Sequence, residues 1–345
     1  MFHGKKIFVS KQAGIGDVLL ITPILAEIKR LYPSCKMILM TFANAVNAMD
    51  GLPFIDEIFA YDKKKDSSFT LFKKLWGCDV ALLLDLQYRP AILSAIAQIP
   101  VRVGISHKRK FWLTHSCDWE EYMDHTYEPY VFSDVLRKTI GLEIPYNSLN
   151  KLYISNPQKA DIDYVNELLR KNKIDYKDRY LVCSPLTAHS LKNWELSRWN
   201  ELFQKVYEKY KIRTVIFGDK NLNFNWDNES VVDISEKTNL RQVAVLIKRA
   251  KLLVNSCSLP VHIANAVDTQ SIILYGYTDY NRWASKYKCE IISANLSCSP
   301  CDGYIGTDCL YPKCMEAISV EMVMCVLEKY IDSEAVDENI NMLSY

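Results

Sequence analysis

A strand, a tight turn and a helix follow one another near the start of the chain, in KIFVSKQAGIGDVLLITPILAEIKRL (residues 6–31). β-Branched and aromatic side chains over 5–10 predict a buried strand, and the apolar spacing over 17–31 predicts a helix. Gly14 and Gly16 lie in the turn, where the absence of a side chain lets a ligand approach the backbone. This stretch indicates an α/β fold with a ligand-binding turn after its first strand.

The alternation of strand and helix continues along the rest of the chain. Further strands are predicted at 36–42, 79–86, 101–105, 180–185, 213–218, 251–256 and 271–276. Helices are predicted at 90–99, 197–210, 240–250, 259–267 and 316–331. The strand segments are apolar along their whole length, which is typical of parallel strands covered by helices on both faces. The sequence thus predicts doubly wound parallel sheets.

Two domains are expected, because 345 residues exceed what one hydrophobic core usually supports. The chain turns polar over 155–178, and we place the boundary there. This gives an N-terminal Rossmann-like domain over 1–165 and a C-terminal one over 166–345. Sheets of this kind bind ligands at the carboxyl ends of their strands, so we expect the two domains to face a central cleft that holds the substrate.

Composition and charge exclude several classes of function. Hydrophobic residues make up 49% and charged residues 24% of the chain, as in packed globular proteins. With 42 basic and 41 acidic residues the net charge is +1, so no basic excess is available to bind a nucleic-acid backbone. The sequence shows neither an export signal nor a membrane-spanning stretch. It predicts a cytoplasmic protein whose contact with a membrane would be peripheral.

Asp17 follows the second glycine of the first turn and has two interpretations. At the start of a helix, an aspartate commonly caps the free backbone amides. A carboxylate at this place can also act as a general base toward a substrate hydroxyl. A dinucleotide-binding site is disfavoured, because Leu19 stands where the third small residue of that motif belongs.

The residues around Asp17 resemble the opening of glycosyltransferase family 9, which includes the ADP-heptose:lipopolysaccharide heptosyltransferases. GIGDVLLITPILAEIKRLYP (14–33) carries the Gly-Asp pair, the apolar run and the following Thr-Pro, here Thr22 and Pro23. The resemblance implies a GT-B fold and an inverting transfer of a sugar from a nucleotide-diphosphate donor to a glycan acceptor. It assigns the role of general base to Asp17, and it implies no cofactor for catalysis.

Gly14 and Gly16 of the first turn are expected to bind the donor, and the resemblance places the other donor residues in the second domain. In PLTAHSLKNW (185–194), Thr187 and Lys192 fall on the family's hydroxyl and lysine positions. A departing nucleoside diphosphate gains negative charge that a cation stabilises, which gives Lys192 its catalytic role. Gly218 matches the glycine at a strand end, and Asp219 stands in for the family's carboxylate at the donor ribose. Thr238 falls where relatives line the base pocket.

A second donor segment, LVNSCSLPVHIANAV (253–267), departs from the family pattern at two positions. Cys257 stands where the family has an aspartate, and Leu259 where it has a glycine, so the contacts to the donor sugar should differ and heptose is in question. Ser258 opens a helix whose free amides suit a phosphate. His262 either lies beside the diphosphate or is a buried structural residue. Because of these departures, a nucleotide-sugar-binding protein without turnover is the alternative to an enzyme.

Four of the eleven cysteines, Cys298, Cys301, Cys309 and Cys314, crowd into a loop over 298–314. Their spacing is typical of a tetrahedral four-sulfur site, which predicts a structural zinc or iron ion without a catalytic role. Reduced thiols packed in a loop and disulfide bonds are the alternatives. Many members of family 9 look similar in this segment.

The segment FWLTHSCDWEEYMDHTYEPY (111–130) lies where relatives contact the acceptor. Its aromatic residues, such as Tyr122, either stack on sugar rings or cover a core. A basic cluster, Arg102, Lys108, Arg109 and Lys110, meets a phosphorylated acceptor or anionic lipid headgroups, or it lies in a solvated loop. The expected partners are a nucleotide-sugar donor similar to ADP-heptose and a glycan or glycolipid acceptor such as the lipopolysaccharide core.

Overall fold

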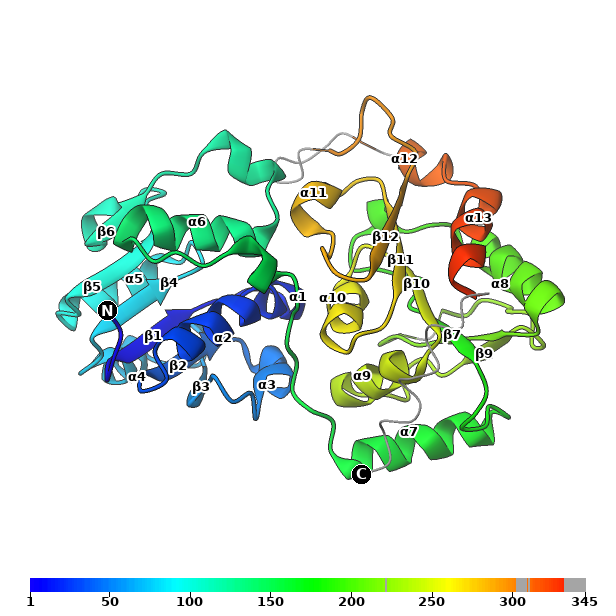
Figure 1. The fold of residues 1–345 in the computed structure, drawn as a ribbon, viewed down its shortest axis with the longest axis horizontal. Helices are drawn as coiled ribbons and strands as arrows, with labels where there is room; N and C mark the ends of the chain where they lie inside the picture. Colours follow the sequence, from blue (N-terminus) through cyan, green and yellow to red (C-terminus); the bar gives the residue numbers. More distant parts are fainter. Residues whose placement is uncertain (221, 302–308, 310, 332–345) are drawn as a thin grey trace. The chain divides into compact units, whose positions relative to one another are not determined.

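The computed structural model describes residues 1–220, 222–301, 309 and 311–331 (Figure 1). The chain divides into two compact units, Met1–Asn156 and Pro157–Tyr345. The division precedes helix α7 (Lys159–Lys171), whereas the boundary expected from the sequence, between 165 and 166, falls within that helix. Each unit is built on one six-stranded sheet.

The sheet of the first unit has the strand order β3-β2-β1-β4-β5-β6, and every pair in it is parallel. Its strands are β1 (Lys6–Ser10), β2 (Lys36–Thr41), β3 (Glu57–Ala60), β4 (Val80–Leu83), β5 (Val101–Ile105) and β6 (His115–Cys117). Central β1 pairs with β2 on one side and with β4 on the other. This is the Rossmann order, in which ligands bind where the strand order reverses. That point is the carboxyl end of β1.

Helices cover both faces of the first sheet. They are α1 (Ile15–Leu19), α2 (Thr22–Leu31), α3 (Ala43–Met49), α4 (Ser68–Leu75), α5 (Tyr88–Ile96) and α6 (Glu128–Ile140), with short 3₁₀ helices η1 (Lys110–Trp112), η2 (Glu121–His125) and η3 (Tyr146–Leu149). α4 and α5 pack on a core that includes Phe8, Met40 and Ala81 of the sheet. α2 packs with α6 on the other face (Figure 1).

The second unit repeats the topology of the first. Its strand order is β12-β11-β10-β7-β8-β9, again parallel throughout. The strands are β7 (Tyr180–Cys183), β8 (Arg213–Ile216), β9 (Val231–Asp233), β10 (Leu252–Ser256), β11 (Ser271–Tyr275) and β12 (Cys289–Ser293). Counted from β7, this is the same Rossmann order. The expected ligand position is the carboxyl end of β7 beside β10.

The helices of the second unit surround a core that is rich in tryptophan. Besides α7 they are η4 (Ser190–Lys192), α8 (Leu196–Tyr210), α9 (Leu240–Arg249), α10 (Leu259–Ala266), α11 (Tyr280–Trp283), α12 (Lys313–Glu316) and α13 (Val320–Ile331). Trp194 and Trp199 meet edge to face at 4.8 Å between ring centroids. The indole Nε1 of Trp194 donates to the carbonyl of Ile318 (3.0 Å), which ties the segment before α13 to this core. Among the described residues, no helix combines the length and the apolar character needed to cross a bilayer.

The predicted α/β class with two Rossmann-like domains is confirmed. The strands that the sequence did not predict, β3, β6, β9 and β12, are the four edges of the two sheets. The predicted helix over 17–31 is wrong as one element: α1 ends at Leu19 and α2 begins at Thr22. Pro23 explains the break, because proline has no N–H to donate and fits only the first turn of a helix. The helix predicted over 316–331 corresponds to α13, which begins later, at Val320, and ends at the predicted residue, Ile331.

Candidate active site

Asp17 lies in the first turn of α1, directly after the carboxyl end of β1. The N-cap of this helix is Gly14 and not Asp17, and no side chain makes the cap hydrogen bond. A Cβ atom on Gly14 would lie 3.0 Å from the Asp17 carboxylate oxygen Oδ2, so glycine at position 14 leaves the space that this carboxylate occupies. The φ angle of Gly14 is −59°, which any residue can adopt. The reason for glycine at this position is therefore the space beside the Asp17 carboxylate, and not a left-handed backbone conformation.

Asp85, which follows β4, holds the turn that carries Asp17. Its Oδ2 atom accepts hydrogen bonds from the Ser10 hydroxyl (2.5 Å) and from the backbone N–H of Gln12 (3.0 Å). Its Oδ1 atom accepts from the N–H of Gln87 (3.0 Å). Hydrogen bonds to a charged acceptor are about twice as strong as neutral ones. A single carboxylate thus joins the ends of the two central strands, β1 and β4.

A buried lysine lies in the same turn. Lys11 is 5% exposed, and its ammonium nitrogen lies 3.4 Å from Oε1 of Glu128 at the start of α6. The same nitrogen lies 4.5 Å from the centroid of the Phe132 ring. Because a buried charge is costly unless it is paired, this contact fixes α6 against the turn after β1.

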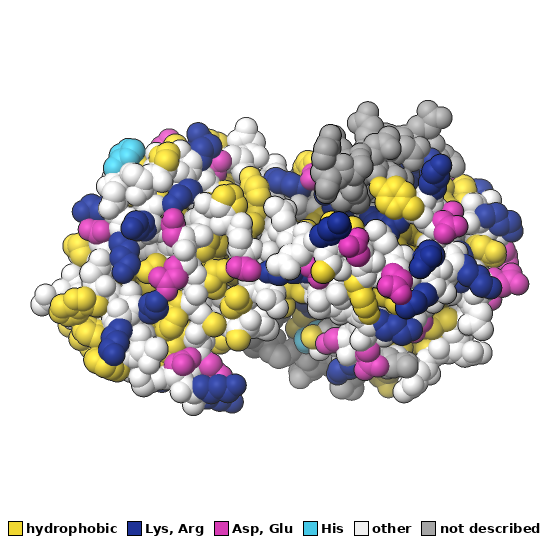
Figure 2. Space-filling view, turned by 90° about the horizontal axis from the view of Figure 1, so that it is seen from below, with side chains coloured by type: hydrophobic (Ala, Val, Ile, Leu, Met, Phe, Trp, Pro, Cys, Tyr) yellow, Lys and Arg dark blue, Asp and Glu magenta, His cyan; other side chains and the backbone are white. Residues whose placement is uncertain are grey.

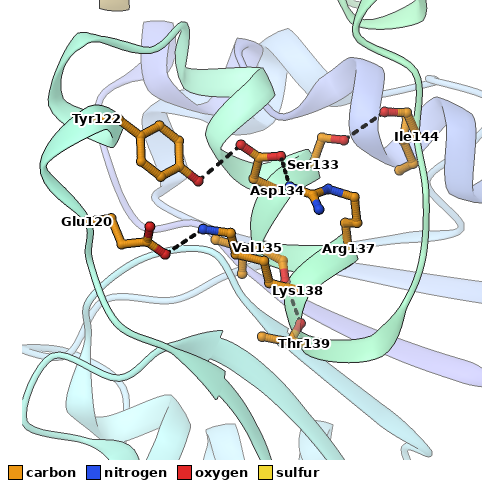
Figure 3. Close-up of polar contacts among 9 residues, drawn as sticks. All are labelled: Glu120, Tyr122, Ser133, Asp134, Val135, Arg137, Lys138, Thr139 and Ile144. Carbon is orange, nitrogen blue, oxygen red and sulfur yellow. Dashed lines mark hydrogen bonds and ion pairs between the residues drawn. The ribbon is translucent and has the colours of Figure 1, made fainter.

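The aromatic segment before α6 is engaged in a polar network within the first unit (Figure 3). The Tyr122 hydroxyl donates to Asp134 (3.1 Å), and Arg137 donates to the same buried carboxylate (2.9 Å). Lys138 pairs with Glu120 and lies 4.8 Å from the centroid of the Tyr122 ring. Burial, followed by a hydrogen bond to Asp134, raises the pKa of Tyr146 to about 12. The Tyr122 hydroxyl is thus hydrogen-bonded to Asp134 of α6, within the first unit.

The basic cluster expected over residues 102–110 is not a solvent-facing patch as a whole. The Arg109 side chain is fully buried, and it donates to the carbonyls of Ile105, Gln87 and Leu83 at 2.9, 3.1 and 3.1 Å. Arg102 donates to the carbonyl of Trp112 (2.7 Å). These two guanidinium groups bind backbone carbonyls near β5, so they are not part of an exposed anion site, whereas Lys108 and Lys110 are exposed, as the solvated-loop interpretation expects.

In the second unit, Asn255 of β10 organises the carboxyl edge of the sheet. It is fully buried, and its Oδ1 atom accepts from the N–H of Ser184, the residue after β7 (2.6 Å). Its Nδ2 atom donates to Oγ of Ser258 (2.9 Å) and to the carbonyl of Ser256 (2.8 Å). Ser258 is the N-cap of α10, so one amide side chain connects the end of β7 with the amino end of this helix.

Lys192, Cys257 and His262 come together beside the amino end of α10. Burial, with a smaller contribution from Lys192, lowers the pKa of His262 to about 4. Burial raises the pKa of the Cys257 thiol, although Lys192 acts in the opposite direction. Both residues are therefore neutral at pH 7, and the Lys192 ammonium supplies the positive charge of the group. The Nδ1 atom of His262 is buried and has no hydrogen-bond partner among the described residues.

Thr187 shapes the loop between β7 and Lys192. Its N–H donates to Oδ1 of Asn193 (2.8 Å), and its hydroxyl donates to the carbonyl of His189 (2.8 Å). The His189 ring stacks on Tyr277, with the ring centroids 4.6 Å apart. Tyr277 follows β11, so this stack joins the loops after β7 and β11. The Lys192 loop is thus held at both ends.

The remaining residues predicted to bind the donor follow strands of the second sheet or precede its helices. Gly218 follows β8, and a Cβ atom there would lie 3.9 Å from Oγ of Ser184, an ordinary contact. Its carbonyl accepts from the N–H of Glu236 (2.7 Å). Asp219 is exposed. Thr238 precedes α9, and its hydroxyl oxygen is buried without a hydrogen-bond partner among the described residues.

The four cysteines do not form the predicted metal site in the part of the chain that the structure describes. Within that part, no three His, Cys, Asp or Glu side chains are grouped to hold an ion. The Cys301 thiol lies 3.7 Å from the Cys298 carbonyl, and the Cys309 thiol lies 3.1 Å from the carbonyl of Tyr311. All four are free thiols. The expectations of a zinc or iron site and of a metal-binding protein therefore have no support here.

The cysteine segment nevertheless lies next to the donor residues. The Ser299 hydroxyl donates to the Gly276 carbonyl (2.5 Å), and the N–H of Cys301 donates to the Tyr277 carbonyl (3.1 Å). A Cβ atom on Gly276 would lie 2.7 Å from the sulfur of Cys314, so only glycine allows this close packing. The segment is thus anchored to the loop after β11, whose Tyr277 stacks on His189.

Known proteins share both the fold and the sequence pattern. The glycosyltransferase family 9 structure from Veillonella parvula DSM 2008 superposes with a TM-score of 0.78 at 18% identity, covering 96% of this chain and 99% of the other. The structure of E. coli ADP-heptose lps heptosyltransferase II superposes with a TM-score of 0.75 at 16% identity, covering 94% of this chain and 98% of the other. These likenesses define the fold as GT-B, with two Rossmann-like domains.

The sequence comparisons define the family. The sequence model of glycosyltransferase family 9 (heptosyltransferase) matches residues 68–307. Lipopolysaccharide heptosyltransferase 3 of Escherichia coli (strain K12) is 20% identical over 284 residues, which cover 78% of this chain and 81% of the relative. The chain belongs to glycosyltransferase family 9, and it is a glycosyltransferase.

Several residues that organise these sites were not predicted from the sequence. Asn255 and Ser184 tie the donor edge together, and Asp85 holds the turn of Asp17. Asn255 interrupts the apolar run KLLVNS, and Asp85 directly follows the run VALLL. A polar residue that ends an apolar strand was therefore the signal that could have found them, because such residues lie at the ligand-binding edge of a parallel sheet.

Proposed function

We propose that this protein transfers heptose, or a closely related sugar, from an ADP-sugar to a glycan or glycolipid acceptor such as the lipopolysaccharide core. The observation that carries the proposal is the group at the amino end of α10, where the Lys192 ammonium lies near a neutral His262 and a neutral Cys257. Such a site suits a diphosphate, since free helix amides and a cation both attract an anion. Family membership and the relatives' names supply the sugar and the acceptor.

In the proposed reaction, the acceptor hydroxyl oxygen attacks the anomeric carbon of the donor. A new C–O bond forms as the bond to the diphosphate breaks, and the nucleoside diphosphate leaves with the electron pair. Asp17 takes the hydroxyl proton, and Lys192 stabilises the charge on the departing diphosphate. Attack from the side opposite the leaving group inverts the anomeric centre. The reaction requires both residues to reach one donor and acceptor pair, an arrangement that stays a prediction.

Thr187, Gly218, Asp219, Thr238 and Ser258 complete the proposed donor site. The buried hydroxyl oxygen of Thr238 and the buried Nδ1 atom of His262 have no hydrogen-bond partners among the described residues, which supports polar contacts with a ligand. Gly14 and Gly16, in the turn beside Asp17, are proposed to contact the donor through their backbone. We place the reaction in the cytoplasm, at the surface of the inner membrane, where a glycolipid acceptor would be available.

The test is an assay of transfer with donor and acceptor together with a measurement of donor binding. A true donor at about 100 times its dissociation constant should stabilise the fold by about 2.7 kcal/mol. ADP-heptose is expected to do so, and ADP should be released only when an acceptor glycan is present. Stabilisation without ADP release from any acceptor tested would contradict the enzyme and support a binding protein. The absence of stabilisation by every ADP-sugar would contradict the proposed donor.

The Asp85 network predicts a positioning effect on turnover. In Asp85→Ala the turn after β1 loses its acceptor for Ser10 and Gln12, so the Asp17 carboxylate should shift. We expect kcat to fall about 10- to 100-fold, while the KM for the donor changes little. Steady-state kinetics measure kcat and the donor KM separately. Asp85→Asn keeps one acceptor oxygen and should therefore recover part of kcat. Equal losses in kcat and in donor affinity would contradict a positioning role.

A further inference from the structure

Helix α4 and its C-cap residue carry three aromatic side chains at the surface of the first unit. Phe69 is 62% and Trp76 is 63% exposed, and Phe72 between them is half-buried. The opposite face of the helix is fully buried through Leu71 and Leu75. A helix at the surface of a globular protein ordinarily carries polar residues on its outer face. An exposed aromatic row of this kind indicates a surface that binds a partner.

The three aromatic residues form one continuous row. Phe69 and Phe72 stack with 6.4 Å between ring centroids and 13° between ring planes, and Phe72 meets Trp76 at 5.4 Å. Phe69 and Phe72, at i and i+3, lie on the same side of α4, and Trp76, the C-cap residue, continues the row. Ser67 caps the helix by accepting from the N–H of Thr70 (3.1 Å), which fixes the start of the row.

Lysines surround this row. Lys63, Lys64 and Lys65 are all exposed in the turn before the helix, and the Lys73 ammonium lies 4.6 Å from the centroid of the Phe69 ring. Lys74 pairs with Glu57 of β3. In Figure 2, the first unit likewise shows hydrophobic side chains, in yellow, beside lysines and arginines, in dark blue. We call the row and its lysines, Phe69, Phe72, Trp76, Lys63, Lys64, Lys65 and Lys73, the α4 surface.

The acidic residues of the turn are bound to its backbone. Asp62 accepts from the N–H of Lys64 (2.9 Å), and Asp66 accepts from the N–H of Asp62 (2.7 Å). Their carboxylates hold the turn and keep their negative charge, while the three lysine side chains of the turn are exposed. With Lys73, the lysines outnumber these two carboxylates, so the net charge that this surface offers to a partner is positive.

We infer that the α4 surface docks on the surface of a bilayer that contains anionic phospholipid. Tryptophan and phenylalanine next to lysine are typical of segments that lie in the membrane interface, where the rings enter the acyl boundary and the ammonium groups meet phosphates. A protein partner fits less well, because protein interfaces favour aromatic residues but are depleted in lysine. The α4 surface belongs to the first unit, to which the sequence resemblance assigns the acceptor.

Co-sedimentation of the full chain with vesicles tests the inference. Binding to vesicles of phosphatidylcholine mixed with phosphatidylglycerol should exceed binding to phosphatidylcholine alone and should weaken with added salt. The double variant Phe69→Ser, Trp76→Ser should lower the partition coefficient at least about tenfold. Replacing Lys63, Lys64 and Lys65 with glutamine should lower it about a hundredfold on the mixed vesicles. Neither change touches a residue of the proposed donor or acceptor chemistry.

A matched control is Tyr311→Ser, which removes an aromatic side chain of the second unit that is 71% exposed. It should bind vesicles as the original chain does, and all variants should keep the same thermal unfolding midpoint. Wild-type binding by either α4 variant, or no preference for the anionic vesicles, overturns the inference. Self-association that is lost in the aromatic variant, without vesicle binding, would also overturn it. The assay uses neither donor nor acceptor, so its result is separate from that of the proposed transfer.

Discussion

Asp17→Asn is expected to lower turnover about 10²- to 10⁴-fold, the usual contribution of a positioned general base. Asparagine has nearly the shape of aspartate, but it cannot take the proton of the acceptor hydroxyl. Donor affinity should be nearly unchanged, because Asp17 is proposed to act on the acceptor hydroxyl and is not one of the proposed donor contacts. Single-turnover kinetics measure the chemical step, and titration calorimetry measures donor binding.

Two further variants sharpen this test. Glu143→Gln removes an exposed carboxylate of the same unit and should leave kcat unchanged. Gly14→Ala adds a Cβ atom 3.0 Å from the Asp17 Oδ2 position, so it should displace the carboxylate and lower kcat while the charge remains. Wild-type turnover in Asp17→Asn would remove this residue as the base. An equal loss in Glu143→Gln would show that the effect is not specific to the site.

The inner strands of both sheets could be predicted from the sequence, whereas their edges could not. An inner parallel strand such as β4 is buried along its whole length and reads as an uninterrupted apolar run. An edge strand has one unpaired side, and β3 and β6 contain no fully buried residue. They are also only four and three residues long, so neither gives the uninterrupted apolar run that marks an inner strand. Pro23 did mark the division between α1 and α2, and the helical periodicity on both sides of it concealed the break.

In the candidate site, too, some residues could be predicted from the sequence and others could not. Residues such as Asp17, Lys192 and His262 were predicted because short motifs around them resemble a known family, and their roles stay predictions. Asn255 and Asp85, which hold those motifs in place, belong to no such motif, because their role depends on which strands lie side by side. Strand order is a property of the fold, and it links residues 73 and 71 positions apart in the Gln12–Asp85 and Ser184–Asn255 hydrogen bonds.

The cysteine segment shows the limit of spacing as an argument. Four thiols within 17 residues satisfy the sequence pattern of a four-sulfur site, but a tetrahedral site also needs all four sulfurs to point to one centre. In the described residues, the Cys309 thiol donates a hydrogen bond to the carbonyl of Tyr311, and the Cys314 side chain packs against Gly276. The segment is held to the loop after β11 by two hydrogen bonds, one from the Ser299 hydroxyl and one from the backbone N–H of Cys301.

Lys192→Ala is expected to weaken donor binding by about 1.5 to 3 kcal/mol, the strength of a hydrogen bond to a charged group. This corresponds to an increase of about 10- to 150-fold in the dissociation constant of ADP-heptose or of ADP alone. Lys192→Arg keeps the charge and should recover part of the affinity. Lys171→Ala, which removes an exposed lysine paired with Glu167 on α7, serves as the matched control and should bind as the original chain does.

A second measurement on Lys192→Ala needs no ligand. The positive charge of Lys192 helps to lower the pKa of His262, although burial is the larger cause. Removing that charge should therefore raise the pKa of His262, and because burial persists, the pKa should stay below the ordinary value for histidine. Titration of the His262 ring by NMR follows this shift. A weaker donor affinity with an unchanged His262 pKa would mean that Lys192 acts away from the amino end of α10, and the diphosphate would then have to be placed elsewhere on this edge of the sheet.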